Sequence, residues 1–204
     1  MRDNGRLLFG PAAAIVFAAG VATLPFFIPG YDPLRQTVSE IGEIGSPMRW
    51  PFAALLWATA LCLLVFALGV WSARREGRRG ALDAAAVFCI AWMGVAAAAL
   101  GYFAHPHPLH NVFGMSELIA YQAPLLFALA WRSEASARGA VAFSALMYLL
   151  TLASVIFNLV ALADNGALWA AVGPVYGLVQ RSLFACFFIW SAGVGWRLWA
   201  RKAS

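Results

Sequence analysis

Six apolar blocks, each about as long as a helix that crosses a lipid bilayer, dominate this 204-residue chain. In lipid, backbone polar groups must be satisfied within a helix or a closed barrel, and the chain lacks the ten-residue alternation of a barrel strand. The blocks therefore predict an all-α fold, a bundle of six transmembrane helices in one domain covering residues 1–204. The expected spans are 7–27, 51–72, 84–104, 112–131, 139–163 and 176–199.

The distribution of charge predicts how the bundle is oriented. Of the 14 Lys and Arg residues, 11 fall on one side of the expected spans, and only Arg35, Arg49 and Arg181 fall on the other. By the positive-inside rule, both termini are expected in the cytoplasm. The basic residues lie at helix ends and form no platform interleaved with aromatic side chains. The net charge of +5 therefore indicates contacts with membrane lipids and no nucleic-acid partner.

The first external link, "PGYDPLRQTVSEIGEIGSPMRW", carries helix signals. Asp32 before Pro33 is typical of a helix start, and Thr37 with Glu40 forms a second possible capping box. We expect a short amphipathic helix on the membrane surface, with an apolar stripe at Leu34, Val38 and Ile41. Two placements stay open: the stripe dips into lipid, or Ser39 and Glu40 face inward as a lid over a cavity.

The stretch "HPHPLHN" holds all three histidines of the chain. His105 and His107 each precede a proline, which favours extended backbone, and His110 follows Pro108 near the start of the fourth span. Three neutral imidazoles that converge can hold zinc with one position left open for water, so His105, His107 and His110 are the candidate metal ligands. The alternative is a polar loop whose histidines only titrate near neutral pH.

Glu117 is the only acidic residue well inside an expected span. It lies two helical turns from His110 on the same face, and a carboxylate at this depth normally faces the bundle interior with a partner. Arg181, next to Gln180, is the expected partner, either as a structural ion pair or as part of a polar pocket. Asn158, near the outer end of the fifth span, is expected at the wall of such a cavity.

The segments "YDPLRQTVSEIGEIGSP" and "GYFAHPHPLHNVFG", within a six-span layout, resemble the bacterial and archaeal membrane family catalogued as domain of unknown function 998. The resemblance covers nearly the whole chain and is most specific at the Ser39-Glu40-Ile41-Gly42 block. It implies the inner membrane of a prokaryote, and it implies that the first external loop and the His110 region belong together. It implies no activity.

Two functions are open on these residues. In the first, a metal-dependent hydrolase or transferase acts on a membrane lipid, with metal-activated water and with Glu117, Glu40 and Ser39 as the catalytic candidates. In the second, the protein is a non-enzymatic module for lipid binding, small-solute transport or an accessory role. The ligand-binding candidates are Arg35, Asn111, Asn158, Gln180 and Arg181.

Overall fold

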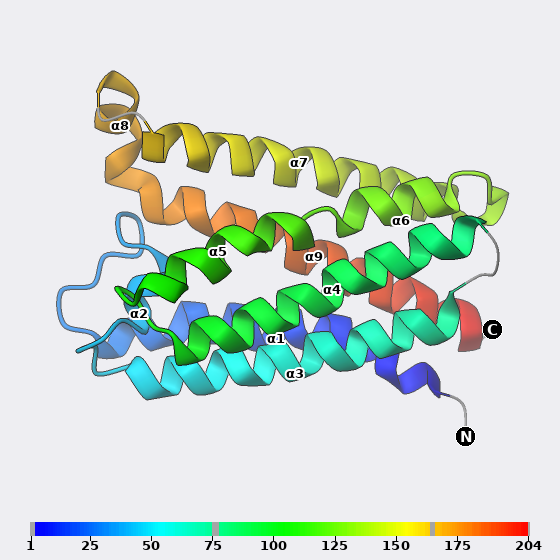
Figure 1. Ribbon diagram of the computed structural model, residues 1–204, viewed down its shortest axis with the longest axis horizontal. Helices are drawn as coiled ribbons and strands as arrows, with labels where there is room; N and C mark the ends of the chain where they lie inside the picture. Colours follow the sequence, from blue (N-terminus) through cyan, green and yellow to red (C-terminus); the bar gives the residue numbers. More distant parts are fainter. Residues whose placement is uncertain (1–2, 75–77, 164–165, 204) are drawn as a thin grey trace.

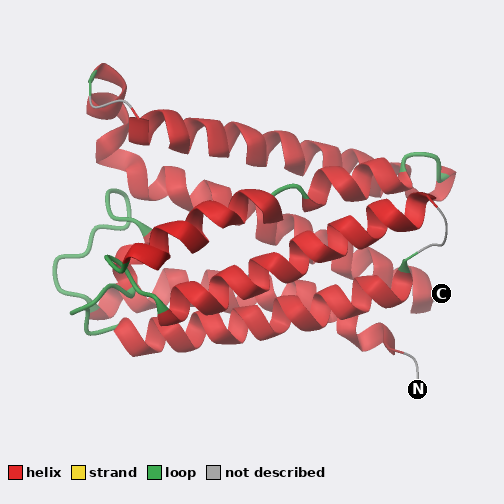
Figure 2. Cartoon of the chain, in the orientation of Figure 1, coloured by secondary structure: helices red, strands yellow, loops and turns green. Residues whose placement is uncertain are grey.

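The computed structural model describes residues 3–74, 78–163 and 166–203, and within these ranges the regular structure is entirely helical (Figures 1 and 2). Six segments are long and apolar enough to cross a membrane, which confirms the predicted fold class of an integral membrane protein. The α-helices are α1 (Phe9–Thr23), α2 (Val38–Ile41), α3 (Arg49–Ala73), α4 (Arg78–Tyr102), α5 (Pro108–Ala120), α6 (Ala123–Trp131), α7 (Arg138–Ala163), α8 (Ala167–Val172) and α9 (Tyr176–Ala203). Short 3₁₀ segments lie at Asp3–Leu8, Leu24–Phe27, Ala135–Ala137 and Gly173–Val175.

The spans pack as a closed ring. In order around it, α3 packs on α4, α4 on α5 and α6, α6 on α7, α7 on α9, α9 on α1, and α1 back on α3. Small residues let α4 approach α3: a methyl group added at Gly94 would lie 3.1 Å from the carbonyl oxygen of Ala60. Both termini lie at one end of the bundle, and α2 and the histidine segment lie at the other (Figure 1). We call these the termini end and the histidine end.

The fourth span is broken, whereas the sequence predicted one continuous helix over 112–131. It begins earlier, at Pro108, and divides at Tyr121 and Gln122 into α5 and α6. Pro124, in the first turn of α6, explains the break because proline has no N–H to donate and its ring crowds the carbonyl of Ala120, four residues earlier. As a result α6 lies beside α7, while α5 diverges from it toward the histidine end (Figure 1).

The expected helix in the first external link is present but short. It starts at Thr37, where the capping box with Glu40 is confirmed, whereas Asp32 starts only a turn by accepting the N–H of Leu34 at 2.9 Å. Val38 and Ile41 are buried in the core of the bundle. The placement with this stripe in lipid is therefore wrong for α2, which is packed inward over the ends of the spans.

Candidate functional site

A groove of about 740 Å³ opens at the histidine end, where α5 has diverged from α7. Its walls come from α2, α4, α5, α7, α9 and the segment before α5. Eight residues singled out from the sequence line it, which are Ser39, Glu40, His105, His110, Asn111, Glu117, Asn158 and Gln180. The groove lies beside the part of the fourth span that precedes the break at Pro124. Polar residues of four separate segments meet in it, which are α2, the histidine segment with α5, α7 and α9.

Ser39 and His110 form the chemically most specific contact in the groove. The Nδ1 atom of His110 lies 2.8 Å from the carbonyl oxygen of Phe103, and its Nε2 atom lies 3.1 Å from Oγ of Ser39. A carbonyl can only accept, so Nδ1 carries the hydrogen. In the neutral ring Nε2 is then the acceptor, and the Ser39 hydroxyl donates to it. The hydroxyl proton of Ser39 therefore points at Nε2 of His110, and the Phe103 carbonyl fixes the tautomer of that histidine.

A backbone hydrogen bond and an arginine side chain hold the first external loop against the histidine segment. The N–H of Ile44 donates to the carbonyl oxygen of His105 at 2.8 Å. The Arg49 guanidinium caps the end of α4 by donating to the carbonyl oxygens of Gly101 and Tyr102, both at 2.9 Å. The association of the first external loop with the His110 region, implied by the resemblance, is confirmed.

Glu40 is engaged in shaping its own loop. Its carboxylate accepts the N–H of Thr37 at 2.8 Å, the hydroxyl of Thr37 at 2.8 Å and the side-chain amide of Gln36 at 2.9 Å. Burial raises the pKa of this carboxyl, but the three hydrogen bonds outweigh burial and leave the pKa below its ordinary value. A carboxylate held ionised in this way is a weak base, so the structure favours Glu40 as a capping group.

Gln180 and Arg181 hold the first external loop against α9. The side-chain oxygen of Gln180 accepts the N–H of Val38 at 2.7 Å, and Gln180 also lines the groove. Arg181 donates to the carbonyl oxygens of Pro33 and Gln36, both at 2.8 Å, and to the hydroxyl of Tyr31 at 2.6 Å. The expected Glu117–Arg181 pair is therefore wrong, because the guanidinium is satisfied by neutral acceptors of the loop.

Glu117 is 6% exposed and lies on the same face of α5 as His110, as expected. Its partner is Tyr121, one turn further along, whose hydroxyl donates to the carboxyl at 3.0 Å. No Lys, Arg or His among the described residues forms an ion pair with it. It forms part of the groove wall just before the break in the fourth span.

The three histidines do not converge, and no group of three or more His, Cys, Asp or Glu suited to a metal occurs in the described part of the chain. His107 accepts the N–H of Leu109 at 3.1 Å as the cap of α5. His105 lies 3.6 Å from Glu43, too far for a hydrogen bond. Both ring nitrogens of His110 have the partners given above. Zinc at these residues stays a prediction.

The remaining ligand candidates differ in position. Asn158 is buried in the groove wall, and its NH₂ group donates to the carbonyl oxygens of Ser154 and Val179. Asn111 is an exposed residue of the first turn of α5 and lines the groove. Arg35 is outside the groove, where it is exposed and lies 3.6 Å from Asp32.

Sequence reasoning missed three participants. The carbonyl of Phe103 carries no side-chain signal, so its role in orienting His110 was invisible. Tyr31 lies 150 residues from Arg181, so no local pattern could pair them. Tyr121 could have been found, because a tyrosine four residues after an intramembrane glutamate lies on the same helical face and can bond with it.

A family model described as "Protein of unknown function (DUF998)" matches residues 11–197. No curated protein and no solved structure gives a significant match to the chain.

Proposed function

The chain belongs to the DUF998 family, whose function is unknown, and on that premise we propose that it is a hydrolase or transferase that acts on an ester of a membrane lipid at the extracytoplasmic face. The observation that carries the proposal is the chain of contacts from Ser39 through His110 to the carbonyl of Phe103, placed in the groove between α5 and α7. Ser39 is the nucleophile, and His110 is the general base.

The proposed reaction follows from the direction of these hydrogen bonds. Oγ of Ser39 attacks the ester carbonyl carbon as Nε2 of His110 takes the hydroxyl proton. The Phe103 carbonyl then holds the imidazolium through Nδ1–H, as a third group orients the base in serine hydrolases. His110 returns the proton to the departing alcohol, which leaves an acyl group on Ser39. Attack by water makes the protein a hydrolase, and attack by another alcohol makes it a transferase.

Charge on the former carbonyl oxygen needs a donor aimed at it. We assign this role to Gln180: its oxygen accepts the N–H of Val38, one residue before Ser39, and the residue lines the groove, so its NH₂ group is the donor we expect there. Asn158 is a poorer choice because two backbone carbonyls already accept from its NH₂ group. Gln180 therefore has two roles, holding α2 and donating to the oxyanion.

The groove suits a lipid because many of its walls beyond the Ser39–His110 contact are apolar. Apolar side chains from three helices line it, which are Leu118 of α5, Val155 and Leu159 of α7, and Leu183 and Phe184 of α9. Acyl chains can enter between α5 and α7 directly from the bilayer. The same apolar walls favour the second candidate function, a protein that binds a lipid without changing it.

A covalent probe separates the two functions. A fluorophosphonate with a long alkyl chain reacts with a serine that is activated by a base, so it should label the purified protein at Ser39, as mapped by peptide mass spectrometry. Ser39→Ala should abolish the labelling and His110→Asn should reduce it by about 100-fold or more, the range of general base catalysis. His107→Asn is the matched control, because it replaces a neighbouring histidine that does not contact Ser39.

Labelling that persists in Ser39→Ala, or that falls equally in His110→Asn and His107→Asn, contradicts the enzyme proposal. If no serine is labelled but a lipid co-purifies with wild-type protein, the non-enzymatic function is supported. Comparing the lipids of cells that make wild-type or Ser39→Ala protein then identifies the ester that accumulates.

A further inference from the structure

A smaller cavity also borders the Ser39–His110 contact, and we call it the inner cavity. Its volume is about 40 Å³, and its lining comes from α1, α2, α3, α4, α5 and α9. Most of the residues that line it are buried in the bundle. Three residues line both the inner cavity and the groove, which are Ser39, His110 and Glu117. The proposed reacting pair therefore borders two spaces.

The hydroxyl of Thr59 is the polar group that marks the inner cavity. The side chain of Thr59 is fully buried, and its hydroxyl has no hydrogen-bond partner among the described residues. A threonine within a helix often bonds to the carbonyl four residues earlier, as Thr151 does in α7 by donating to Met147 at 2.7 Å. An unsatisfied buried hydroxyl lowers stability, so a group of this kind indicates that something else supplies its partner.

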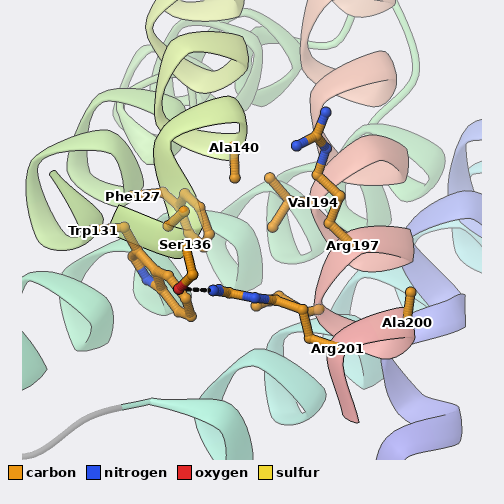
Figure 3. A pocket seen from close by; sticks show the side chains of 10 residues that line it. Phe127, Trp131, Ser136, Ala140, Val194, Arg197, Ala200 and Arg201 are labelled. Atoms are coloured by element: carbon orange, nitrogen blue, oxygen red, sulfur yellow. Dashed lines mark hydrogen bonds between the residues drawn. The ribbon is translucent and has the colours of Figure 1, made fainter. Parts of the chain in front are cut away.

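The cavity at the termini end differs in this respect (Figure 3). There the guanidinium of Arg201 donates to the hydroxyl of Ser136 and lies over the ring of Trp131. These polar groups have partners within the protein, whereas the Thr59 hydroxyl has none in the part of the chain that the structure describes. The inner cavity is therefore the better candidate for a ligand.

Glu117 lies at nearly the same depth in the bundle as Thr59. Helix α4 packs against both α3 and α5, so its contacts show the depth of each. A Cβ atom at Gly94 would lie 3.1 Å from the carbonyl oxygen of the residue after Thr59. The indole N–H of Trp92 donates to the carbonyl oxygen of the residue before Glu117 at 3.1 Å. Trp92 and Gly94 are about 3 Å apart along the helix, so the hydroxyl and the carboxyl line one level of the inner cavity.

The size and the polar groups of the inner cavity suit water. Among the described residues, the Glu117 carboxyl accepts one hydrogen bond, from Tyr121 to one of its two oxygens, so its other oxygen can accept a second. The Thr59 hydroxyl can donate and accept, and Oγ of Ser39 keeps lone pairs that can accept while it donates to His110. One water molecule needs about 10 to 15 Å³ of such space and two to four polar partners. The inner cavity therefore accommodates a short chain of water molecules and no larger ligand.

We propose that the inner cavity binds water between Thr59 and Glu117 and supplies it to the acyl group on Ser39, so that the protein is a hydrolase. This inference rests on the proposed function. The water oxygen attacks the acyl carbonyl carbon while Nε2 of His110 takes one of the water protons. The bond to Oγ of Ser39 then breaks, the proton passes from His110 to Oγ, and a fatty acid is released. Thr59 is a positioning residue, because it acts through the water that it holds.

X-ray radiolysis of the full chain in detergent tests the water site without any catalysis. Radicals made from a bound water oxidise the side chains beside it, so Met93, which is buried and lines the inner cavity, should be oxidised in the wild-type protein. Met147 is the internal control, because it is buried but does not line this cavity. Thr59→Val, which replaces the hydroxyl with a methyl group, should lower Met93 oxidation toward that of Met147, and Thr59→Ser should preserve it. If Met93 is oxidised no more than Met147 in the wild-type protein, the proposal is overturned.

A second measurement tests whether this water reaches the acyl group. With p-nitrophenyl palmitate as the ester and ethanol as a competing acceptor, Thr59→Val should lower the ratio of free palmitate to ethyl palmitate by about tenfold, the effect of one lost hydrogen bond on a rate. Thr151→Val is the matched control, because the Thr151 hydroxyl bonds within its own helix, and it should leave the ratio unchanged. Equal ratios in the two valine variants would show that the water comes from elsewhere, which contradicts the proposal. If no ester is converted, the proposed function fails, and Met93 oxidation still decides whether the inner cavity binds water.

Discussion

Gly177 lies where the first external loop presses on α9, and replacing it with alanine should separate the two. A Cβ atom at this position would lie 2.3 Å from the carbonyl oxygen of Gln36 and 2.6 Å from that of Pro33. Contacts of Cβ atoms below 3.0 Å essentially do not occur, so the loop backbone has to retreat by at least about 0.7 Å. The Gly177→Ala substitution therefore acts on the loop that carries Ser39 without touching the proposed reacting groups.

The cost can be worked from the hydrogen bonds that cross this contact. A retreat of 0.7 Å lengthens the two Arg181 bonds to Pro33 and Gln36 from 2.8 Å to about 3.5 Å, and the Leu178-to-Leu34 backbone bond from 3.2 Å to about 3.9 Å. Such bonds contribute about 1 kcal/mol each, more when one partner is charged, so their weakening costs about 3 kcal/mol. Alanine regains about 1 kcal/mol in helix propensity. The expected net loss is about 2 kcal/mol.

Thermal unfolding in detergent, followed by tryptophan fluorescence, measures this loss. Gly177→Ala should lower the Tm by about 4 to 8 °C for a chain of this size, and it should also reduce fluorophosphonate labelling at Ser39. Gly114→Ala is the matched control: it makes the same substitution in a helix at the same groove, where a Cβ atom would meet nothing within 4 Å. It should leave the Tm unchanged or raise it. Equal Tm values for the two variants would refute the reasoning.

Three further predictions concern acid stability, metal and the break in the fourth span. Folding lowers the pKa of Glu40, so its ionised carboxylate stabilises the protein above the ordinary value of 4.5, and this stability is lost as pH falls below that value. The Tm of the wild-type protein should therefore fall at acid pH, and the Tm of Glu40→Gln should fall less. Treatment with EDTA should leave Ser39 labelling intact, whereas stoichiometric zinc by elemental analysis, lost in His107→Ala, would support the three-histidine site instead. Pro124→Ala should restore the backbone hydrogen bonds between α5 and α6 and bring α5 toward α7. Cysteines introduced at Leu118 and Val155, in a protein without its native cysteines, should then form a disulfide faster. An unchanged rate would count against proline as the cause of the break.

The spans were predictable because bilayer thickness fixes their length and because lipid leaves the backbone few other solutions. The break in the fourth span was not predictable, although Pro124 is visible in the sequence. Membrane helices often tolerate proline when neighbouring groups satisfy the freed backbone, so a proline alone does not locate a break. Whether the chain divides there depends on how α6 packs against α7, which no local pattern records.

The sequence predicted which residues belong to the candidate site better than it predicted which of them contact one another. Glu117 and His110 share a face of α5, and helical spacing alone places them there. Ser39 and His110 are 71 residues apart, so only the docking of two loops brings them together. Arg181 shows why the expected partner was wrong: a buried acid and a cation on facing helices suggest an ion pair, but loop carbonyls at hydrogen-bond distance satisfy the guanidinium without it.

The position of α2 over the first turn of α5 fixes the depth of the Ser39 hydroxyl along the membrane normal. Under the proposed function, a lipid that stands upright between α5 and α7 carries its ester linkages at the boundary between headgroup and hydrocarbon. We expect the first turn of α5 at that level, because it begins the apolar span Pro108–Trp131. Headgroup bonds lie above that level and chain carbons lie below it. If the proposed reaction is correct, the bilayer itself selects the bond that is cleaved, and the protein can accept varied headgroups and chains while attacking one kind of linkage.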